Sequence, residues 1–108
     1  MCIRDRYYVL SELKKYKKPI IVTENGVADA KDNIRADFIK NHLKYILKAK
    51  NKGVNIKGYL YWSLLDNFEW AHGFKPRFGL IKVDYKTQKR TIRQSAKVYE
   101  KIIKSGII

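Results

Sequence analysis

The stretch Pro19-Ile20-Ile21-Val22-Thr23-Glu24-Asn25-Gly26 is an uncharged apolar run that ends in a carboxylate and two turn residues. Its β-branched character over residues 20–22 is typical of a strand that is buried on both faces of a parallel sheet. In α/β folds, ligands bind beyond the carboxyl ends of such strands. Glu24 is therefore a candidate functional side chain, and the alternatives from its position are a helix cap or an ion pair with a nearby lysine.

The residues after this strand predict a helix over 34–52. Asp32 or Asn33 is suited to cap its first turn, and Gly53 is suited to end it in the left-handed conformation. The spacing of its apolar residues predicts one buried face, made of Ile39, Leu43, Ile46 and Leu47.

A second strand is predicted over 54–64, rich in Tyr, Leu and Trp, with Gly58 where another backbone could approach closely. Strand, helix and strand at this spacing form a β-α-β unit, so the two strands should be parallel. Glu24 and the end of the second strand should therefore lie at the same edge of the sheet.

Three further elements complete the expected α/β organisation. A helix over 7–16 precedes the first strand, and a short strand over 80–85 is followed by a turn at 86–88. Thr91 to Gln94 fits a capping box that opens a last helix over 92–104. Its expected buried face is Ala96, Tyr99, Ile102 and Ile103, with Gly106 as the stop.

The composition restricts the class of protein. The 108 residues carry 45% hydrophobic residues, enough for one small domain, and a formal net charge of +14. The lysines are spread along predicted helices and turns, which favours solvated helix faces over a nucleic-acid surface. The given stretch has no apolar run of membrane-spanning length and no secretory leader, and its single cysteine fits a reducing, cytoplasmic location. Two distant histidines do not indicate a metal site.

The loop over residues 66–79 is unusually aromatic, which indicates that it lines something. Trp62, Glu69 and Trp70 lie near the end of the second strand, and this combination suits a sugar. Aromatic faces stack on the C–H faces of a pyranose, and a carboxylate accepts two hydroxyl hydrogen bonds. From spacing alone, the alternative is that Trp62 belongs to the core and Glu69 to the surface.

Three motifs in order resemble the carboxyl-terminal part of family 1 glycoside hydrolases, which include β-glucosidases and β-galactosidases. They are residues 21–26 (Ile-Val-Thr-Glu-Asn-Gly), residues 58–70 (GYLYWSLLDNFEW), and residues 77–85 with Arg-Phe-Gly-Leu and Val-Asp-Tyr. The resemblance implies the last two strand-helix units of a (β/α)8 TIM barrel, preceded by the end of the sixth helix.

The resemblance also implies roles for single residues. Glu24 would be the nucleophile that forms a glycosyl-enzyme intermediate, and Trp62 would be the platform beside the sugar. Glu69 and Trp70 would bind its outer hydroxyls, and Phe78 would line the far wall. Members of the family that act on 6-phosphosugars lack the carboxylate at the position of Glu69, so unphosphorylated β-glucosides or β-galactosides are the expected substrates. No metal or organic cofactor is implied.

Retaining chemistry needs a second carboxylate about 5 Å from the nucleophile. In the family it belongs to an Asn-Glu-Pro motif, which these 108 residues lack, and the resemblance makes Asp66 a structural residue instead. We therefore expect a fragment whose partner is the remainder of the barrel, inactive and poorly soluble alone. Residues 1–6 are interpreted as a leader that is not native to the domain, and 7–108 as a partial catalytic domain. The sequence does not specify the oligomeric state.

Two alternatives remain open at this stage. One is a carbohydrate-binding barrel that has lost its acid/base residue. The other is a small basic nucleic-acid-binding protein whose aromatic side chains stack on bases. Under the glycosidase interpretation, the expected partners are a β-linked glycoside and the remaining barrel, with neither nucleic acid nor membrane.

Overall fold

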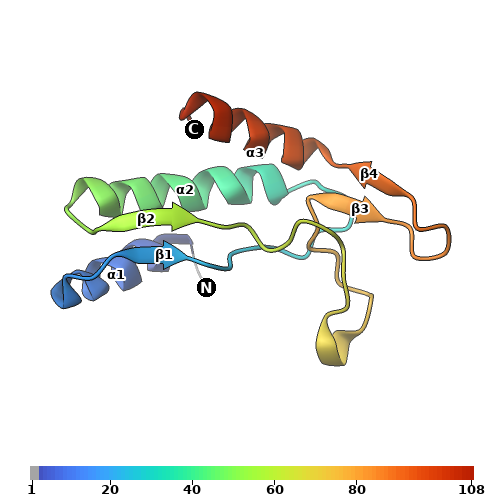
Figure 1. The fold of residues 1–108 in the computed structure, drawn as a ribbon, viewed down its shortest axis with the longest axis horizontal. Helices are drawn as coiled ribbons and strands as arrows, with labels where there is room; N and C mark the ends of the chain where they lie inside the picture. Colours follow the sequence, from blue (N-terminus) through green and yellow to red (C-terminus); the bar gives the residue numbers. More distant parts are fainter. Residues whose placement is uncertain (1–2) are drawn as a thin grey trace.

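The computed structural model describes residues 3–108, and a β-α-β unit organises the first half of this chain (Figure 1). Helix α1 and a short 3-10 helix, η1, lead into strand β1, helix α2 and strand β2. Their bounds are α1 Ile3–Leu13, η1 Lys14–Tyr16, β1 Ile20–Val22, α2 Arg35–Asn51 and β2 Ile56–Tyr59. β1 and β2 pair in parallel, as predicted from the spacing.

The second half consists of a loop, a hairpin and a helix. The elements are the 3-10 helix η2 Trp70–His72, strands β3 Ile81–Val83 and β4 Arg90–Ile92, and helix α3 Gln94–Ser105. β3 and β4 are antiparallel, and a single parallel bridge between Leu65 and Ile81 connects the chain after β2 to β3. α3 packs against α2, so the two strand-helix units, β1-α2 and β2-α3, are neighbours.

The core lies between α1, α2 and one face of the β1-β2 pair. Its buried members are Leu10, Val22, Ile46, Ala49, Val54 and Ile56, and Tyr7, Ile20 and Tyr59 pack against them. The opposite face of the strand pair is uncovered, since Ile21, Leu60 and Leu64 are each more than half exposed. Two strands cannot close a barrel, so an uncovered apolar face is expected where further strands would complete one.

Several helix boundaries differ from the prediction. α1 begins at Ile3 and not at Tyr7, so residues 3–6 are helical, while residues 1 and 2 lie outside the described part of the chain. Whether residues 1–6 are native to the domain stays a prediction. The first amides of α2 are capped by Asp29, whose Oδ2 accepts hydrogen bonds from the backbone N–H groups of Ile34 (2.9 Å) and Arg35 (3.1 Å). The prediction of Asp32 or Asn33 as the cap was wrong.

The predicted capping box at Thr91 was also wrong, because residues 90–92 form β4. α3 starts at Gln94. Asp32, which is distant in the sequence, caps it: its Oδ2 accepts a hydrogen bond from the Ser95 N–H at 2.9 Å. Ile103 was predicted to be buried but is 65% exposed. Gly53 and Gly106 do adopt positive φ angles, 88° and 69°, and end α2 and α3 as predicted.

The second strand is shorter than the predicted 54–64, because regular pairing stops at Tyr59. The chain nevertheless stays beside the first strand. Leu60 donates its N–H to the Val22 carbonyl at 2.8 Å, and Trp62 donates its N–H to the Asn25 carbonyl at 3.1 Å. These two hydrogen bonds carry the chain across the carboxyl end of β1, where the candidate site lies.

Candidate active site at the carboxyl ends of two parallel strands

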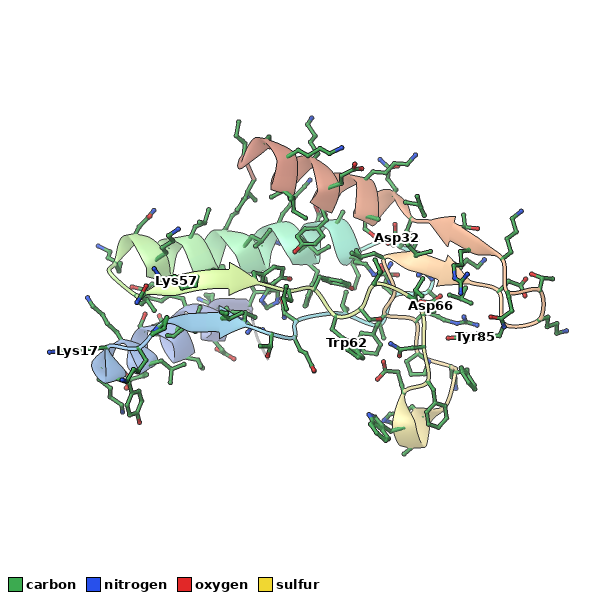
Figure 2. All side chains as sticks on the ribbon, in the orientation of Figure 1. Lys17, Asp32, Lys57, Trp62, Asp66 and Tyr85 are labelled. Carbon is green, nitrogen blue, oxygen red and sulfur yellow. The ribbon has the colours of Figure 1, made fainter. Side chains whose placement is uncertain are left out.

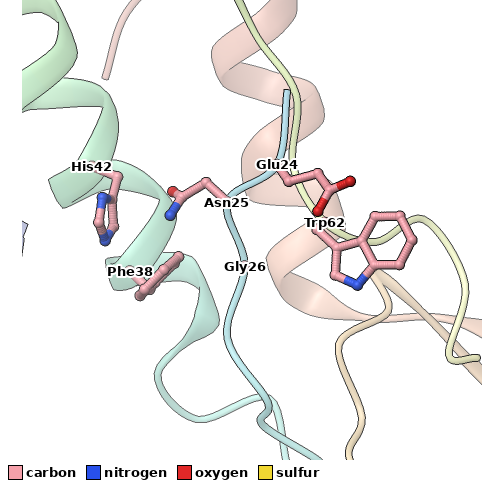
Figure 3. A pocket seen from close by; sticks show the side chains of 6 residues that line it. All are labelled: Glu24, Asn25, Gly26, Phe38, His42 and Trp62. Atoms are coloured by element: carbon pink, nitrogen blue, oxygen red, sulfur yellow. The ribbon is translucent and has the colours of Figure 1, made fainter. Parts of the chain in front are cut away.

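Glu24 and Trp62 line one pocket of about 320 Å³ (Figure 3). The other residues of its wall are Asn25, Gly26, Phe38 and His42. Glu24 lies two residues beyond β1, and Trp62 lies three residues beyond β2. The parallel pairing therefore brings the two predicted site residues to the same edge of the sheet.

Close contact between the two loops depends on Gly26. A Cβ atom at this position would lie 1.7 Å from the Trp62 carbonyl oxygen, which is far inside van der Waals contact. The glycine allows the backbone after Glu24 to run against the backbone at Trp62, and the bond from Trp62 N–H to the Asn25 carbonyl fixes this arrangement. The spacing between Glu24 and the indole is thus set by the backbone.

Glu24 is exposed, and its carboxylate forms no hydrogen bond or ion pair with any of residues 3–108. Its oxygens are available to a ligand. The two lysines labelled at the opposite end of the molecule, Lys17 and Lys57, lie away from this edge (Figure 2). The alternative in which Glu24 caps α2 does not occur, because Asp29 caps it.

Trp62 and Glu69 are joined directly. The indole Nε1–H of Trp62 donates to Oε1 of Glu69 at 3.1 Å, although Glu69 lies seven residues further along the loop. This bond orients the indole ring, and it leaves the second carboxylate oxygen of Glu69 open to another donor.

The other two predicted site residues lie outside this pocket. Trp70 is 83% exposed, at the start of η2, with a positive φ of 48°. Phe78 is half-buried, and its backbone carbonyl accepts a hydrogen bond from the Tyr61 hydroxyl at 3.1 Å. Within residues 3–108 the structure thus groups Glu24, Trp62 and Glu69, whereas Trp70 and Phe78 extend the surface beside them.

Asp66 is enclosed by donors and is only 4% exposed. Arg93 donates to both of its oxygens at 3.0 and 3.1 Å, and the backbone N–H groups of Gly79 and Val83 donate at 2.9 and 3.3 Å. Burial raises the pKa of Asp66, but the hydrogen bonds from Arg93, Gly79 and Val83 outweigh it and leave the pKa below its ordinary 3.8. Asp66 connects the loop after β2 to the hairpin, as expected of a structural residue.

Two buried polar residues of α2 were missed by sequence reasoning. Arg35 is fully buried and donates from Nε to the Tyr61 hydroxyl at 3.0 Å and from Nη2 to the Arg77 carbonyl at 2.8 Å. His42 is 1% exposed and lines the pocket beside Phe38. The signal was present, because both lie in the same helical register as Ile39 and Ile46, whose side chains face the core.

Two observations concern other kinds of site. Among residues 3–108, no three His, Cys, Asp or Glu side chains gather in a way that could hold a metal ion. Over the same residues, none of the helices combines the length and the apolar character that crossing a membrane requires.

Comparisons with known proteins identify the fold first. The β-glycosidase from Pyrococcus horikoshii superimposes with a TM-score of 0.93 at 45% identity, covering 96% of this chain and 25% of that one. The fold is therefore the carboxyl-terminal part of a (β/α)8 TIM barrel, as the resemblance implied.

The sequence comparison then identifies the family. The profile described as "Glycosyl hydrolase family 1" matches residues 3–107, so the chain belongs to this family. It is 46% identical to a "Beta-galactosidase" of Saccharolobus solfataricus over 103 residues, which are 94% of this chain and 21% of that protein. It is also 46% identical to a "6-phospho-beta-galactosidase" of Clostridium acetobutylicum over 102 residues, 87% of this chain and 21% of that protein. The chain thus spans about a fifth to a quarter of the length of these relatives.

Proposed function

We propose that this chain contributes the nucleophile and part of the sugar site of a retaining β-glycosidase that hydrolyses unphosphorylated β-glucosides or β-galactosides. The observation that carries the proposal is the unpaired carboxylate of Glu24, at the carboxyl end of β1, in one pocket with the indole of Trp62. A nucleophilic carboxylate has to be accessible to the anomeric carbon, and the matched family gives the reaction class.

In this mechanism a carboxylate oxygen of Glu24 attacks the anomeric carbon while the bond to the leaving oxygen breaks. A second carboxyl group protonates that oxygen, then removes a proton from the water that cleaves the glycosyl ester. Asp66 does not suit this second role, because it is buried and both of its oxygens accept hydrogen bonds from Arg93. We assign the acid/base to a part of the barrel outside residues 3–108.

Trp62 and Glu69 suit the binding of the sugar. The indole provides an apolar face, and its N–H is held by one oxygen of Glu69. The other oxygen of Glu69 is suited to accept a hydrogen bond from a sugar hydroxyl. In our proposal Trp70 and Phe78 extend this surface toward the outer hydroxyls and the hydroxymethyl group.

The preference for unphosphorylated sugars depends on Glu69. Relatives named for a galactoside and for a 6-phosphogalactoside are both 46% identical to this chain, so overall identity does not separate the two substrate classes. A carboxylate next to the indole disfavours a phosphate dianion through like-charge repulsion. This local charge supports the unphosphorylated class.

The test requires a complete barrel. In a hybrid enzyme, this whole chain replaces the matching segment of the Pyrococcus horikoshii β-glycosidase. That segment matches 96% of this chain. We expect the hybrid to hydrolyse an aryl β-glucoside, and the isolated chain to be inactive and poorly soluble.

In the hybrid, Glu24→Ala should lower turnover by roughly 10⁴-fold or more, as removal of a nucleophile does. Added azide should restore cleavage and yield the α-glycosyl azide, because it attacks from the side that Glu24 vacates. Glu100→Gln is the matched control, since Glu100 is an exposed carboxylate on α3 paired with Lys104. Full activity of Glu24→Ala without azide would refute the assignment, as would sugar binding without hydrolysis in the unaltered hybrid.

A further inference from the structure

His42 is a buried polar side chain whose hydrogen-bonding capacity is unused. It is 1% exposed, and neither Nδ1 nor Nε2 has a hydrogen-bond partner within residues 3–108. Its ring lies against Phe38 with the centroids 4.2 Å apart, and both rings line the pocket that contains Glu24. A buried imidazole without partners is unfavourable, so its position beside the pocket calls for a partner there.

Asn25 lies between His42 and Glu24. Figure 3 shows its side chain directed toward α2, where His42 and Phe38 lie, while Glu24 and Trp62 lie on the other side of the chain. The Oδ1 atom of Asn25 accepts a hydrogen bond from the Tyr59 hydroxyl at 2.9 Å, and its backbone carbonyl accepts one from Trp62 N–H at 3.1 Å. Its amide nitrogen, Nδ2, is a donor for which the structure gives no acceptor within residues 3–108.

We infer that His42 is a positioning residue for Glu24: in the complete barrel its ring accepts a hydrogen bond from Nδ2 of Asn25, a contact that residues 3–108 alone do not make. This inference depends on the proposed role of Glu24 for its functional consequence. The contact itself can be tested separately from that role.

The protonation state of His42 suits this contact. Burial and the positive charge of Arg6 on α1 lower the pKa of His42 from 6.5 to about 4. The imidazole is therefore neutral near neutral pH, with one ring nitrogen free to accept. An imidazolium has no free acceptor and would be unable to receive the Asn25 amide.

The effect on Glu24 follows from the chain of contacts. With Tyr59 on the oxygen and His42 on the nitrogen, both ends of the Asn25 amide are held. Asn25 is adjacent to Glu24 in the chain and binds the Trp62 backbone, so it fixes the nucleophile relative to the sugar platform. A loosened nucleophile lowers the rate of the chemical step, while substrate binding through Trp62 and Glu69 persists.

The test compares His42→Leu with His42→Gln in the hybrid enzyme. His42→Leu removes the acceptor, and we expect kcat to fall about tenfold with KM unchanged. His42→Gln retains a carbonyl acceptor and should restore most of kcat. In an Asn25→Ala background, His42→Leu should have no further effect on kcat, because the contact is already absent. Lys50→Leu, on the exposed part of the same helix, is the matched control.

A readout independent of activity completes the test. In ¹⁵N NMR spectra of the hybrid, we expect His42 as a single neutral tautomer whose acceptor-nitrogen shift moves in Asn25→Ala. An unchanged shift would overturn the inference. So would a double variant whose kcat falls by the product of the factors measured for the two single variants. If instead Glu24→Ala remains active, the proposed function fails, and the NMR result still decides the contact between His42 and Asn25.

Discussion

Two buried polar side chains, one from each half of the chain, differ in how fully they are paired. In the half built from β3, β4 and α3, Asp66 receives hydrogen bonds from Arg93 and from two backbone amides. In the half built from β1, α2 and β2, His42 is as deeply buried but has no partner within residues 3–108, and Glu24 is exposed and unpaired. Asp66 is fully paired within residues 3–108, whereas His42 and Glu24 present groups for a ligand and for the rest of a barrel.

This contrast distinguishes two carboxylates that follow neighbouring strands. Asp66 holds the structure together, and Glu24 carries out chemistry in our proposal. The two roles can be separated by substitutions made in the hybrid enzyme.

The largest effect on stability is expected at Asp66. Asp66→Ala leaves the buried guanidinium of Arg93 without its counter-ion and should lower the free energy of unfolding by about 3–5 kcal/mol. Glu24→Gln breaks no contact within residues 3–108 and should change it by no more than about 0.5 kcal/mol. Denaturant unfolding measures both values, and similar losses in the two variants would remove the distinction.

An intermediate effect is expected at Glu69. Glu69→Ser removes a charged hydrogen-bond acceptor next to Trp62 and should lower kcat/KM for an unphosphorylated aryl β-glucoside by about 10- to 100-fold. The same change should reduce the discrimination against the 6-phosphorylated analogue, because the repelling charge is gone. Assays with both substrates give the ratio. A ratio equal to that of the unaltered hybrid would show that Glu69 does not set this preference.

The smallest effect near neutral pH concerns the pH dependence of stability. The folded pKa of His42 is about 4, below its ordinary 6.5, so between these values the unfolded chain binds a proton that the folded chain does not. Stability should therefore be complete above about pH 6.5 and decrease as the pH falls toward 4.

Asp66 affects the pH dependence of stability at lower pH than His42 does. Its folded pKa is below the ordinary 3.8, so its stabilisation is present above that value and is lost as the pH falls through the folded pKa. His42→Leu should flatten only the upper part of the profile, and Asp66→Asn only the lower part. Urea unfolding over a pH series tests this, and a flattening of the same part by both variants would contradict the assignment.

Local patterns in the sequence predicted the β-α-β unit well. The β-branched run before Glu24, the apolar period of α2 and the glycines at 53 and 106 each act through neighbouring residues, so one sequence suffices to interpret them. The shared edge of Glu24 and Trp62 followed from the parallel pairing.

Features that depend on distant residues were not predictable in this way. Asp32 looked like a cap for α2 but caps α3 through Ser95, 63 residues away, and Thr91 looked like a cap but lies in β4, which needs β3 as its partner. The hydrogen bond between Trp62 and Glu69 depends on the turn at η2. Burial of His42 conflicts with its polarity, and such conflicts are expected at functional sites.

The central claim is that Glu24 forms the covalent intermediate. The most direct measurement is to incubate the hybrid enzyme with a 2-deoxy-2-fluoro-β-glucoside that carries a good leaving group, and to locate the adduct by mass spectrometry of proteolytic peptides. The account predicts one fluoroglucosyl group per molecule, attached to Glu24 and absent in Glu24→Gln. An adduct on Glu69 or on any other carboxylate, in an enzyme that is inactivated by the reagent, would contradict it.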